Sequence, residues 1–519
     1  MDKVGLMTSC AVLAALCLAG CATSDGAAPA PAAQRAPTET EQRFAADLDS
    51  FIASTLVRFE TVPALSVAVA TSTGPIYARA HGRADIEAGV PATADTRFYI
   101  ASSTKSFVGL TMALLDARGE IDLDWTLAEL APGIAFRPEL RANEVTLRHL
   151  LSHTHGLRGR PIEFRLAYTG EHDSETLWRL LERLEPRAEA PFGTFRYGNI
   201  GFNIATLLVE RRLGRSWQEM VETELLTPLG MRQTLTRGVA DARARGLIAA
   251  PYNSVVPEGT ARLYLAKEDD MMQSAGGMFS TANDMARWLQ LNLAAARGLP
   301  TPLPRAVVAA THRPLFAFDD RFEMFRRTGY GLGWYSGDYE GATLFHSFGG
   351  FAGSRAHVSF LPERDLGVAV LANDEGIGFA LADIVAVYAY DWFLRGPEQA
   401  ASNARSVLDR MAPRAEERRN AIAADRARRA QRTWQLTLPN SAYAGRYCSP
   451  ELGTLTLSDR DGRLEMALGR LRAMLDPFTE RDTTRIEPVP GQGSVLRFRV
   501  ENGAVLSLEA LDSTFERCA

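Results

Sequence analysis

Ser102 and Lys105 are spaced one helical turn apart and could together form an activated nucleophile. A serine hydroxyl is a weak nucleophile until a neighbouring base removes its proton. Arginine stays protonated in proteins, whereas a buried lysine can lose its proton and act as that base. Of the 57 basic residues only three are lysines, Lys3, Lys105 and Lys267, so nearly all the positive charge is arginine. The pair indicates acyl transfer by a serine enzyme; a serine helix cap followed by a surface lysine is the alternative.

Composition excludes several broad classes of function. The chain has 519 residues, 46% of them apolar, and a formal net charge of −5. Its length allows about two to four domains. Because no basic stripe with interleaved aromatic residues is present, nucleic-acid binding is not expected. After the N-terminus, no segment is long and apolar enough to predict a membrane span.

The N-terminus predicts export and lipidation. Residues 1–20 combine an early lysine with a long apolar run, which is typical of a signal peptide. The run ends in Leu-Ala-Gly-Cys21, which resembles a bacterial lipobox, so Cys21 is expected to be the lipidated first residue of the mature protein. With Ala22 in second place, we expect a cell-envelope protein anchored by lipid on the periplasmic face of the outer membrane.

The remaining cysteines form an even pair. Cys10 and Cys17 would leave with the signal peptide, and Cys21 would carry the lipid. Cys448 and Cys518 then remain in an oxidising compartment, where paired cysteines form disulfides. We therefore predict a Cys448–Cys518 disulfide.

Apolar periodicity predicts an α+β domain at residues 43–396, after a flexible Ala/Pro/Thr-rich tether at 21–42. Strand patterns open and close this domain, and helical patterns fill its middle, which favours an antiparallel sheet with a helical insertion. Helices are expected at 44–56, from Ser102 to Gly119, and at 379–394; strands are expected at 65–70, 74–80, 331–335, 343–346, 357–361 and 366–371.

The C-terminal third divides into two further segments. Residues 397–434 are rich in Arg, Ala and Glu and predict a charged linker helix with a solvated face. Residues 435–519 read as short strands, with hairpin turns at Asp461-Gly462 and Asn502-Gly503. A Cys448–Cys518 bridge would join the first strand of this small all-β domain to its last, as expected for a closed barrel.

Four motifs in the same order resemble the serine β-lactamase-related family, which includes class C β-lactamases, D-alanyl-D-alanine carboxypeptidases, D-aminopeptidases and family VIII esterases. They are Ser102-Ser-Thr-Lys105, the stretch Leu150-Leu-Ser-His-Thr-His-Gly-Leu157, Tyr197-Gly-Asn199 and Ala275-Gly-Gly-Met-Phe-Ser-Thr281. The resemblance covers roughly residues 40–395. It implies a penicillin-binding-protein-like sheet flanked by helices with a helical subdomain, and the C-terminal segment resembles a small barrel appended to some relatives.

The resemblance also implies roles for Tyr197 and Asn199. Tyr197 would protonate the leaving group and later activate the deacylating water. Because a phenol titrates near 10, Tyr197 would need the Lys105 charge nearby to work at neutral pH. Asn199 would support the substrate site, or could simply cap the helix that follows.

The third motif of the family departs from its usual pattern of a cation, a small residue and a glycine. In one register His346 supplies the cation but the glycine is lost; in the other Ser347, Phe348 and Gly349 keep the glycine but lose the cation. We favour the second register, with the Gly350 N–H completing an oxyanion hole with the Ser102 amide and His346 packed in the strand. Without the lysine that binds a β-lactam carboxylate, esters, amides and peptides are favoured over efficient β-lactam hydrolysis.

Three histidines have a spacing that could suggest a metal site. His149, His153 and His155 could in principle bind zinc, but no carboxylate or cysteine cluster accompanies them. They fall in or beside the Leu150–Leu157 stretch, so a structural turn is the favoured interpretation. We expect no metal and no cofactor.

These observations favour a serine hydrolase that acts through an acyl-enzyme on small esters, D-amino-acid amides or peptides, including peptidoglycan-derived ones. The alternative is a non-catalytic binding lipoprotein, or a penicillin-sensing receptor that is acylated without turnover. The expected partners are a small-molecule or peptide substrate and, through the N-terminal lipid, a membrane.

Overall fold

The computed structural model describes residues 36–518, and from Pro37 onward these form one compact unit. The predicted signal peptide, Cys21 and most of the predicted tether lie outside the described residues. Helix α1 (Glu39–Arg58) begins within the predicted tether at 21–42, so the tether prediction is wrong for residues 39–42. Thr38 and Glu41 form a capping box there, which satisfies the first amide groups of the helix.

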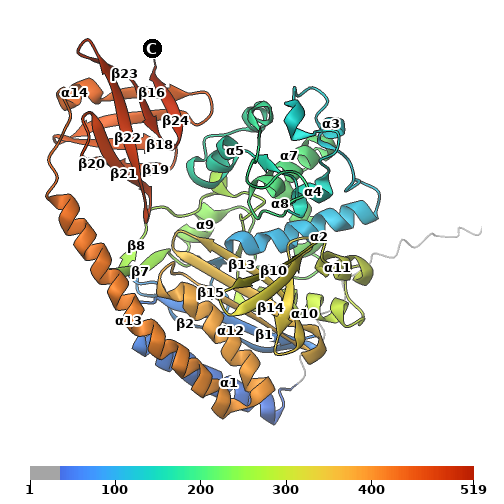
Figure 1. Ribbon diagram of the computed structural model, residues 1–519. Helices are drawn as coiled ribbons and strands as arrows, with labels where there is room; N and C mark the ends of the chain where they lie inside the picture. The colour runs from blue at the N-terminus through green and yellow to red at the C-terminus, as the bar shows by residue number, and fades with distance from the viewer. Residues whose placement is uncertain (1–35, 519) are drawn as a thin grey trace, which may run out of the picture. The chain divides into compact units, whose positions relative to one another are not determined.

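The core of the protein is a nine-stranded antiparallel sheet (Figure 1). The sheet joins distant parts of the chain, because the N-terminal strand β1 pairs in its interior with the late strand β15. The strand order is β10 (Phe316–Phe322), β11 (Phe325–Tyr330), β12 (Tyr335–Tyr339), β13 (Ala342–Phe351), β14 (Ser354–Leu361), β15 (Leu366–Ala372), β1 (Ala64–Thr71), β2 (Gly74–Asp85) and β3 (Val90–Pro91).

Alternating side chains of β1 pack on different helices. Leu65, Val67 and Val69 belong to the hydrophobic cluster that includes α1 and α12 (Ile377–Arg395), whereas Ala68 and Ala70 belong to the cluster of α10 (Ala282–Ala296). This is the period of two expected for a strand buried on both faces. Small alanines let α10 approach the sheet closely. Contrary to the sequence prediction, helix α12 is long and apolar enough to span a membrane by length and composition, but 72% of its apolar window is buried inside the protein.

The helical insertion lies between β3 and β10. It contains α2 (Thr104–Ala117), α3 (Leu127–Leu130), α4 (Leu147–Leu151), α5 (Arg160–Phe164), α6 (Ser174–Leu180), α7 (Ile200–Leu213), α8 (Trp217–Val221), α9 (Val239–Ala244), α10 and α11 (Arg305–His312). Three two-stranded ladders accompany them: β4 (Phe98–Tyr99) with β9 (Phe279–Ser280), β5 (Leu157–Arg158) with β6 (Glu185–Pro186), and β7 (Tyr252–Val256) with β8 (Gly259–Arg262). The predicted fold class is confirmed.

One predicted strand is wrong. Residues 331–334 form the turn between β11 and β12, closed by a hydrogen bond from the Gly331 amide to the Trp334 carbonyl. Gly333 has φ 88°, and a Cβ there would lie 2.4 Å from the Lys105 carbonyl oxygen. The apolar residues of this segment are buried because the turn packs on the start of α2, which imitates the burial pattern of a strand.

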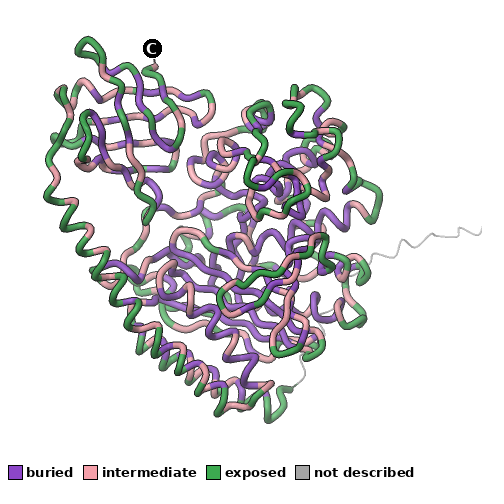
Figure 2. The backbone as a smooth tube through the Cα atoms, in the orientation of Figure 1, coloured by how far each residue is buried: buried purple, intermediate pink, exposed green. Residues whose placement is uncertain are grey.

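The C-terminal region consists of a long helix and a second nine-stranded sheet. Helix α13 (Pro397–Ala430) is the predicted charged linker, and Figure 2 shows it mostly exposed along its outer side. The sheet follows the order β19 (Leu471–Met474), β18 (Arg463–Leu468), β17 (Gly453–Arg460), β16 (Gly445–Ser449), β24 (Ser513–Arg517), β23 (Ala504–Ala510), β22 (Gln492–Glu501), β21 (Thr483–Val489) and β20 (Asp476–Pro477), with the short helix α14 (Asn440–Tyr443) before it.

This second sheet forms a nearly closed barrel, as predicted. Both hairpins predicted from Asp-Gly and Asn-Gly are present, between β17 and β18 and between β22 and β23. The Cys448–Cys518 disulfide is present, with 5.5 Å between the Cα atoms, and it joins β16 to the end of β24. The domain boundaries at 396 and 434 stay predictions, because clustering of contacts leaves the whole described chain after Ala36 in one unit.

Candidate active site

Ser102 lies in a tight turn that leads into α2. The turn is a 3-10 helix (Ala101–Ser103), and Ala101 has φ 45°, a left-handed conformation that is costly for a residue with a Cβ. Such a cost is tolerated where surrounding contacts hold the backbone. Here a Cβ on Gly276 would lie 3.5 Å from the Ser102 amide nitrogen, so the loop at Gly276 packs directly on the turn.

Lys105 is buried beneath Ser102, with 1% of its surface exposed. Its Nζ lies 3.2 Å from Ser102 Oγ, 2.8 Å from Asn199 Oδ1 and 2.7 Å from the Ala275 carbonyl oxygen. Burial lowers the pKa of Lys105 to about 7, and the nearby Glu163 carboxyl partly opposes that shift. A substantial fraction of Lys105 is therefore uncharged at neutral pH and lies within reach of the serine proton.

Tyr197 is the third member of this group. Its phenol forms a hydrogen bond with Ser102, and the Lys105 Nζ lies 4.9 Å from the centre of its ring. Burial nevertheless raises the pKa of Tyr197 to about 12, against the lowering effects of Ser102 and Arg327. That Tyr197 needs the Lys105 charge nearby to work at neutral pH stays a prediction, and the Lys105 amine does lie beside its ring. Tyr197 holds its proton and can donate it.

Asn199 holds Lys105 rather than capping α7. Its side chain makes no capping hydrogen bond, although it occupies the position before the first residue of the helix. Its Oδ1 accepts from Lys105 Nζ, and its backbone N–H donates to Glu163 Oε1 at 3.2 Å. Asn199 thus connects the buried lysine to Glu163, the carboxylate that raises its pKa.

The stretch from Leu150 to Leu157 positions the Tyr197 segment. The His153 carbonyl accepts a hydrogen bond from the Arg196 amide, and the His153 ring lies 4.6 Å from that of Tyr197. His153 Nε2 bonds the Tyr330 hydroxyl at 3.1 Å, and His155 Nδ1 accepts from the Leu157 amide at 2.9 Å.

His149, in turn, is part of the capping box of α4. The three histidines face different partners: His149 lies in α4, and His153 and His155 lie in the packed turn that follows it.

The loop from Ala275 to Thr281 also contacts the nucleophile segment. Ala275 supplies the carbonyl that binds Lys105, Gly276 packs on Ser102, and Thr281 caps α10 by accepting from the Asp284 amide at 3.2 Å. Because the cap fixes where α10 begins, it also fixes the loop that precedes it.

His346 and Gly349, the residues that distinguish the two candidate registers of the third motif, lie on opposite faces of β13. A Cβ on Gly349 would lie 1.9 Å from the Ile100 carbonyl oxygen, so only glycine permits this approach of β13 to the nucleophile turn. Ser347, two residues earlier, shares that face. Gly350 follows directly on the same strand, paired with Arg355 of β14, and its role as an oxyanion donor stays a prediction.

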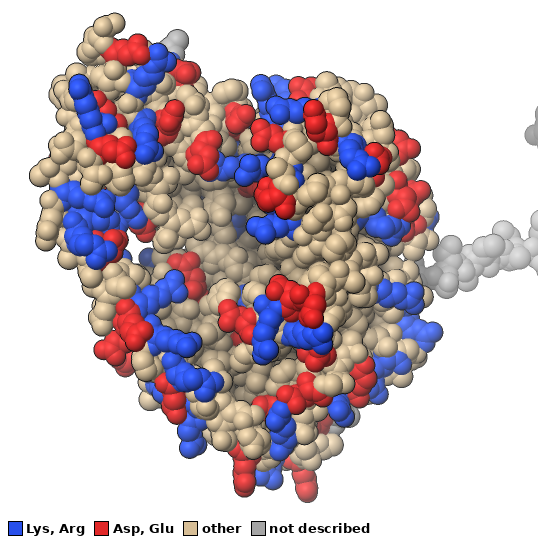
Figure 3. Space-filling model, viewed as in Figure 1, with Lys and Arg blue, Asp and Glu red and all other residues tan. Residues whose placement is uncertain are grey.

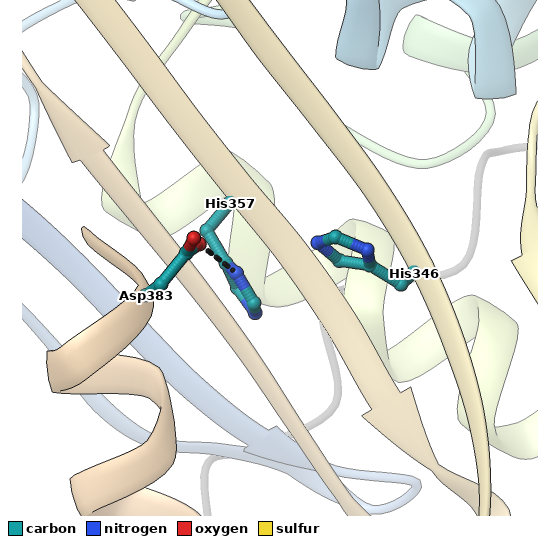
Figure 4. Close-up of side chains that lie close together, drawn as sticks. All are labelled: His346, His357 and Asp383. Atoms are coloured by element: carbon teal, nitrogen blue, oxygen red, sulfur yellow. Dashed lines mark hydrogen bonds and ion pairs between the residues drawn. The ribbon is translucent and has the colours of Figure 1, made fainter. Parts of the chain in front are cut away.

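His346 faces the other way, toward α12. Figure 4 shows it opposite His357 and Asp383, which come from β14 and α12. His357 Nδ1 bonds Asp383 at 2.8 Å and its Nε2 bonds Ser359 at 2.6 Å, while Asp383 also pairs with Arg355 at 3.2 Å. The spacing would allow a metal ion, but both nitrogens of His357 are engaged and a guanidinium occupies the carboxylate. These groups fit a hydrogen-bond network better than a metal site.

Three contributors to the site were not predicted from the sequence: Glu163, the Ala275 carbonyl and Arg327. Glu163 stands in a short helix with no distinguishing pattern, and a backbone carbonyl has no sequence signature. Arg327 is one arginine among more than fifty in the chain. Only contacts across the fold identify them.

The space-filling view is hollowed near its middle (Figure 3), next to the region where Figure 1 shows the start of α2 and β13. Charged side chains of both signs surround the hollow.

Comparison with known proteins identifies the family of this chain. The family model described as Beta-lactamase matches residues 52–390, well over half of the chain. The chain is similar to Esterase EstB of Burkholderia gladioli, at 32% identity over 52% of this chain and 74% of that protein. It is also similar to Unguisins hydrolase ungD' of Aspergillus campestris (strain IBT 28561), at 25% identity over 79% of this chain and 77% of that protein.

A solved structure shows the same fold over nearly the whole chain. The octameric penicillin-binding protein homologue from Pyrococcus abyssi superposes with a TM-score of 0.56, covering 91% of this chain and 99% of that one, at 21% identity. At this identity the likeness concerns the fold alone, and it includes the C-terminal region.

Proposed function

Because the chain belongs to the Beta-lactamase family, whose members similar to it include esterases and other hydrolases, we propose that it is a serine hydrolase that forms an acyl-enzyme on Ser102. The observation that carries the proposal is the pair of Lys105 Nζ and Ser102 Oγ, 3.2 Å apart, with the pKa of the lysine lowered to about 7. A lysine whose pKa lies near the working pH is well matched to general-base catalysis.

Acylation moves two protons. Uncharged Lys105 takes the Ser102 proton as Oγ attacks the substrate carbonyl, and the oxyanion is stabilised by the amides of Ser102 and Gly350. When the intermediate collapses, Tyr197 gives its proton to the leaving group. The site then holds an ester on Ser102, a protonated Lys105 and a Tyr197 phenolate.

Deacylation returns both protons. The Tyr197 phenolate takes a proton from water, and the resulting hydroxide attacks the ester carbonyl. Ser102 leaves and regains its proton from Lys105, which completes hydrolysis. Tyr197 therefore needs the Lys105 charge only in the acyl-enzyme, which explains how a phenol with a raised resting pKa can serve both steps.

We place small esters and D-amino-acid amides first among substrates, followed by peptides, including those derived from peptidoglycan. Aromatic rings pack around Tyr197, with those of Tyr335 and Phe348 5.9 and 5.6 Å from it between ring centres. We propose that this aromatic neighbourhood favours substrates with apolar groups. No lysine stands on β13, which weighs against efficient β-lactam hydrolysis.

The test is covalent labelling of the purified protein by a fluorophosphonate probe and by a fluorescent penicillin. We expect the fluorophosphonate to label the wild type, and both Ser102→Ala and Lys105→Met to abolish labelling. Labelling that survives Ser102→Ala would contradict the proposal, and a wild type that neither probe labels would favour a binding protein. Stronger labelling by the penicillin would favour a penicillin-binding role.

We also propose that the protein is anchored in the bacterial cell envelope by lipid on Cys21, on the periplasmic face of the outer membrane. Support comes from the Leu-Ala-Gly-Cys stretch and from Ala22 after it. Mass spectrometry of the N-terminal peptide should find acylated Cys21 in the outer-membrane fraction, and Cys21→Ser should release the protein into the soluble fraction. An unmodified cysteine would contradict the proposal.

A further inference from the structure

Helix α5 and the π-helix that continues it (Arg165–Thr169) contact both the active site and the C-terminal barrel. On the active-site side, Glu163 Oε1 accepts a hydrogen bond from the Asn199 amide at 3.2 Å. Asn199 Oδ1 in turn accepts from Lys105 Nζ at 2.8 Å. The position of the proposed general base therefore depends on where this segment, residues 160–171, is held.

The next residue after Glu163, Phe164, packs on the barrel. It is 8% exposed and belongs to the hydrophobic cluster of the barrel, which also contains Leu452, Leu468 and Leu471. Consecutive side chains of a helix point about 100° apart around its axis, so two neighbours can reach different partners. A single turn of α5 thus contacts the active site with one side chain and the barrel core with the next.

Hydrogen bonds fix the rest of the segment to two turns of the barrel. Arg165 Nε donates to the Glu451 carbonyl at 2.6 Å, in the turn between β16 and β17. The Thr169 carbonyl accepts from the Arg470 amide at 2.9 Å, in the turn between β18 and β19. The barrel supplies a backbone atom to both bonds, so the position of the segment follows that of the barrel.

Gly469, beside Arg470, brings the barrel very close to the segment. Its amide donates to Glu171 Oε1 at 3.2 Å, and a Cβ on Gly469 would lie 2.1 Å from the Thr169 carbonyl oxygen. That separation is far shorter than a van der Waals contact. A larger residue at this position would therefore force the barrel and the segment apart.

The Glu163 carboxyl also acts on Lys105 through its charge. Burial lowers the pKa of Lys105 to about 7, and Glu163 opposes that shift. Burial raises the pKa of Glu163, and the amides of Asn199 and Ile200 and the charges of Arg187 and Lys105 oppose that rise. A carboxylate moved away from Asn199 would leave the effect of burial on Lys105 less opposed.

The other titratable groups around Glu163 and Lys105 are uncharged at neutral pH. Burial raises the pKa of Tyr168, which faces Glu163, and raises that of Tyr197 to about 12. Burial lowers the pKa of His153, which faces Lys105, well below its usual value. The protonation of Lys105 therefore responds to the position of Glu163.

We infer that the C-terminal barrel positions the general base of this hydrolase through the segment 160–171. The inference rests on the proposed function and adds two positioning residues to it, Glu163 on the segment and Gly469 on the barrel, which act through Asn199. Separating the barrel from the segment would withdraw Glu163 from Asn199. Lys105 would then be held less firmly and would lose its proton at a lower pH.

The test compares two glycine substitutions in the barrel. Gly469→Ala places a Cβ against the segment, whereas Gly462→Ala, in the turn between β17 and β18, meets no atom within 4 Å. Both glycines have positive φ, 54° and 81°, so each alanine carries the cost of a left-handed backbone and the two differ in the contact. The measurement is the rate of fluorophosphonate labelling from about pH 5 to about pH 9.

We expect Gly469→Ala to lower the midpoint of the pH profile by about 0.5 pH unit and the plateau rate by roughly threefold to tenfold. Gly462→Ala should keep both wild-type values. Glu163→Gln keeps the shape of the side chain and removes its charge, so it should lower the midpoint at least as far as Gly469→Ala does.

Three results would overturn the inference. The first is an unchanged midpoint in Gly469→Ala beside a lowered one in Glu163→Gln, because the barrel would then not act on the base. The second is an equal shift in Gly462→Ala, which makes no contact with the segment. The third is an unchanged midpoint in Glu163→Gln itself.

A second pair of variants covers the case in which Gly469→Ala does not fold. Arg165→Met removes the bond to the Glu451 carbonyl and should lower the midpoint. Arg160→Met, in the same segment, removes an ion pair with the highly exposed Asp512 and should leave the midpoint unchanged. Equal midpoints in these two variants would contradict the inference.

Labelling of the wild type separates the two levels of proposal. A wild type that is not labelled contradicts the proposed function and this inference with it. A wild type that is labelled, with a midpoint that responds to Glu163→Gln but to neither Gly469→Ala nor Arg165→Met, supports the serine hydrolase and contradicts the role of the barrel alone.

Discussion

Lys105 and Lys267 are the two lysines of the described chain, and they share the same electrostatic condition in different regions. Both are almost fully buried, and burial lowers the pKa of each to about 7. A carboxylate partly opposes the shift in each case, Glu163 for Lys105 and Asp270 for Lys267. Judged by pKa alone, either lysine could be the general base of an enzyme.

Their partners separate them. Lys105 lies against the Ser102 hydroxyl and near the Tyr197 phenol, whereas Lys267 Nζ donates to the Ala167 carbonyl at 2.5 Å and lies 3.9 Å above the Phe351 ring. Within residues 36–518, the hydrogen bonds of Lys267 Nζ run to the backbone carbonyls of Ala167 and Met271 and to no side-chain hydroxyl. The comparison teaches that a lowered pKa follows from burial, while function follows from what the uncharged amine can reach.

The largest expected difference between the two lysines is in activity, and it is tested by replacing each lysine in turn. Lys105→Met should lower the rate of ester hydrolysis by about a thousandfold or more, because the base and the acceptor of the serine proton are both lost. Lys267→Met should change kcat/KM by less than about threefold. The measurement is steady-state kinetics on both purified variants. Comparable losses of kcat/KM in the two would contradict the assignment of Lys105, rather than Lys267, as the general base.

Tyr197→Phe tests whether Tyr197 is the general acid that works together with Lys105. Loss of a general acid costs about 10²–10⁴-fold, and the cost should be larger for amides, whose poor leaving groups need the proton, than for activated phenyl esters. Comparing kcat/KM for an anilide and a phenyl ester of the same acyl group measures this difference. An equal loss on both substrates would indicate that Tyr197 only packs against the lysine.

The pH dependence of labelling tests whether uncharged Lys105 is the active form. The rate of fluorophosphonate labelling should rise about tenfold per pH unit below 7 and level off above it, because only the deprotonated amine accepts the serine proton. Lys267→Met should show the same profile. A midpoint that moves in that variant would mean that the second lysine, and not Lys105, sets the profile.

The smallest expected effect is on stability, and it treats the two lysines alike. Because each amine is less protonated in the folded state than in the unfolded state between pH 7 and about 10, the free energy of unfolding should rise with pH across that window. Each lysine should contribute ~2 kcal/mol between pH 7 and 9. Urea midpoints at the two pH values should show a reduced rise in Lys267→Met, and an unreduced rise would contradict the lowered pKa of Lys267.

How far the sequence predicted this site depends on the kind of contact. The helical turn from Ser102 to Lys105 is local, so its geometry follows from the spacing. The register of the third motif was left as a preference, because alternation along a strand places His346 and Ser347 on opposite faces without saying which face meets the nucleophile. The structure places Gly349 against Ile100, next to the nucleophile turn, which favours the register that keeps the glycine.

Apolar residues can be buried in a turn as well as in a strand, which is why the strand prediction at 331–335 is wrong. The segment at 331–335 was predicted to be a strand because its apolar residues are typical of one. They are buried instead by a glycine turn against α2, an effect of packing between distant segments.

From the sequence alone we could predict the mixed fold, the C-terminal barrel with its Cys448–Cys518 bridge and the pairing of Ser102 with Lys105 across one helical turn. These rest on periodicity, turn chemistry and residue types, which act over a few positions or follow from counting. Only the tertiary structure distinguished Lys105 from Lys267. The physical reason is that desolvation and charge pairing depend on which distant segments meet, and no local pattern records that.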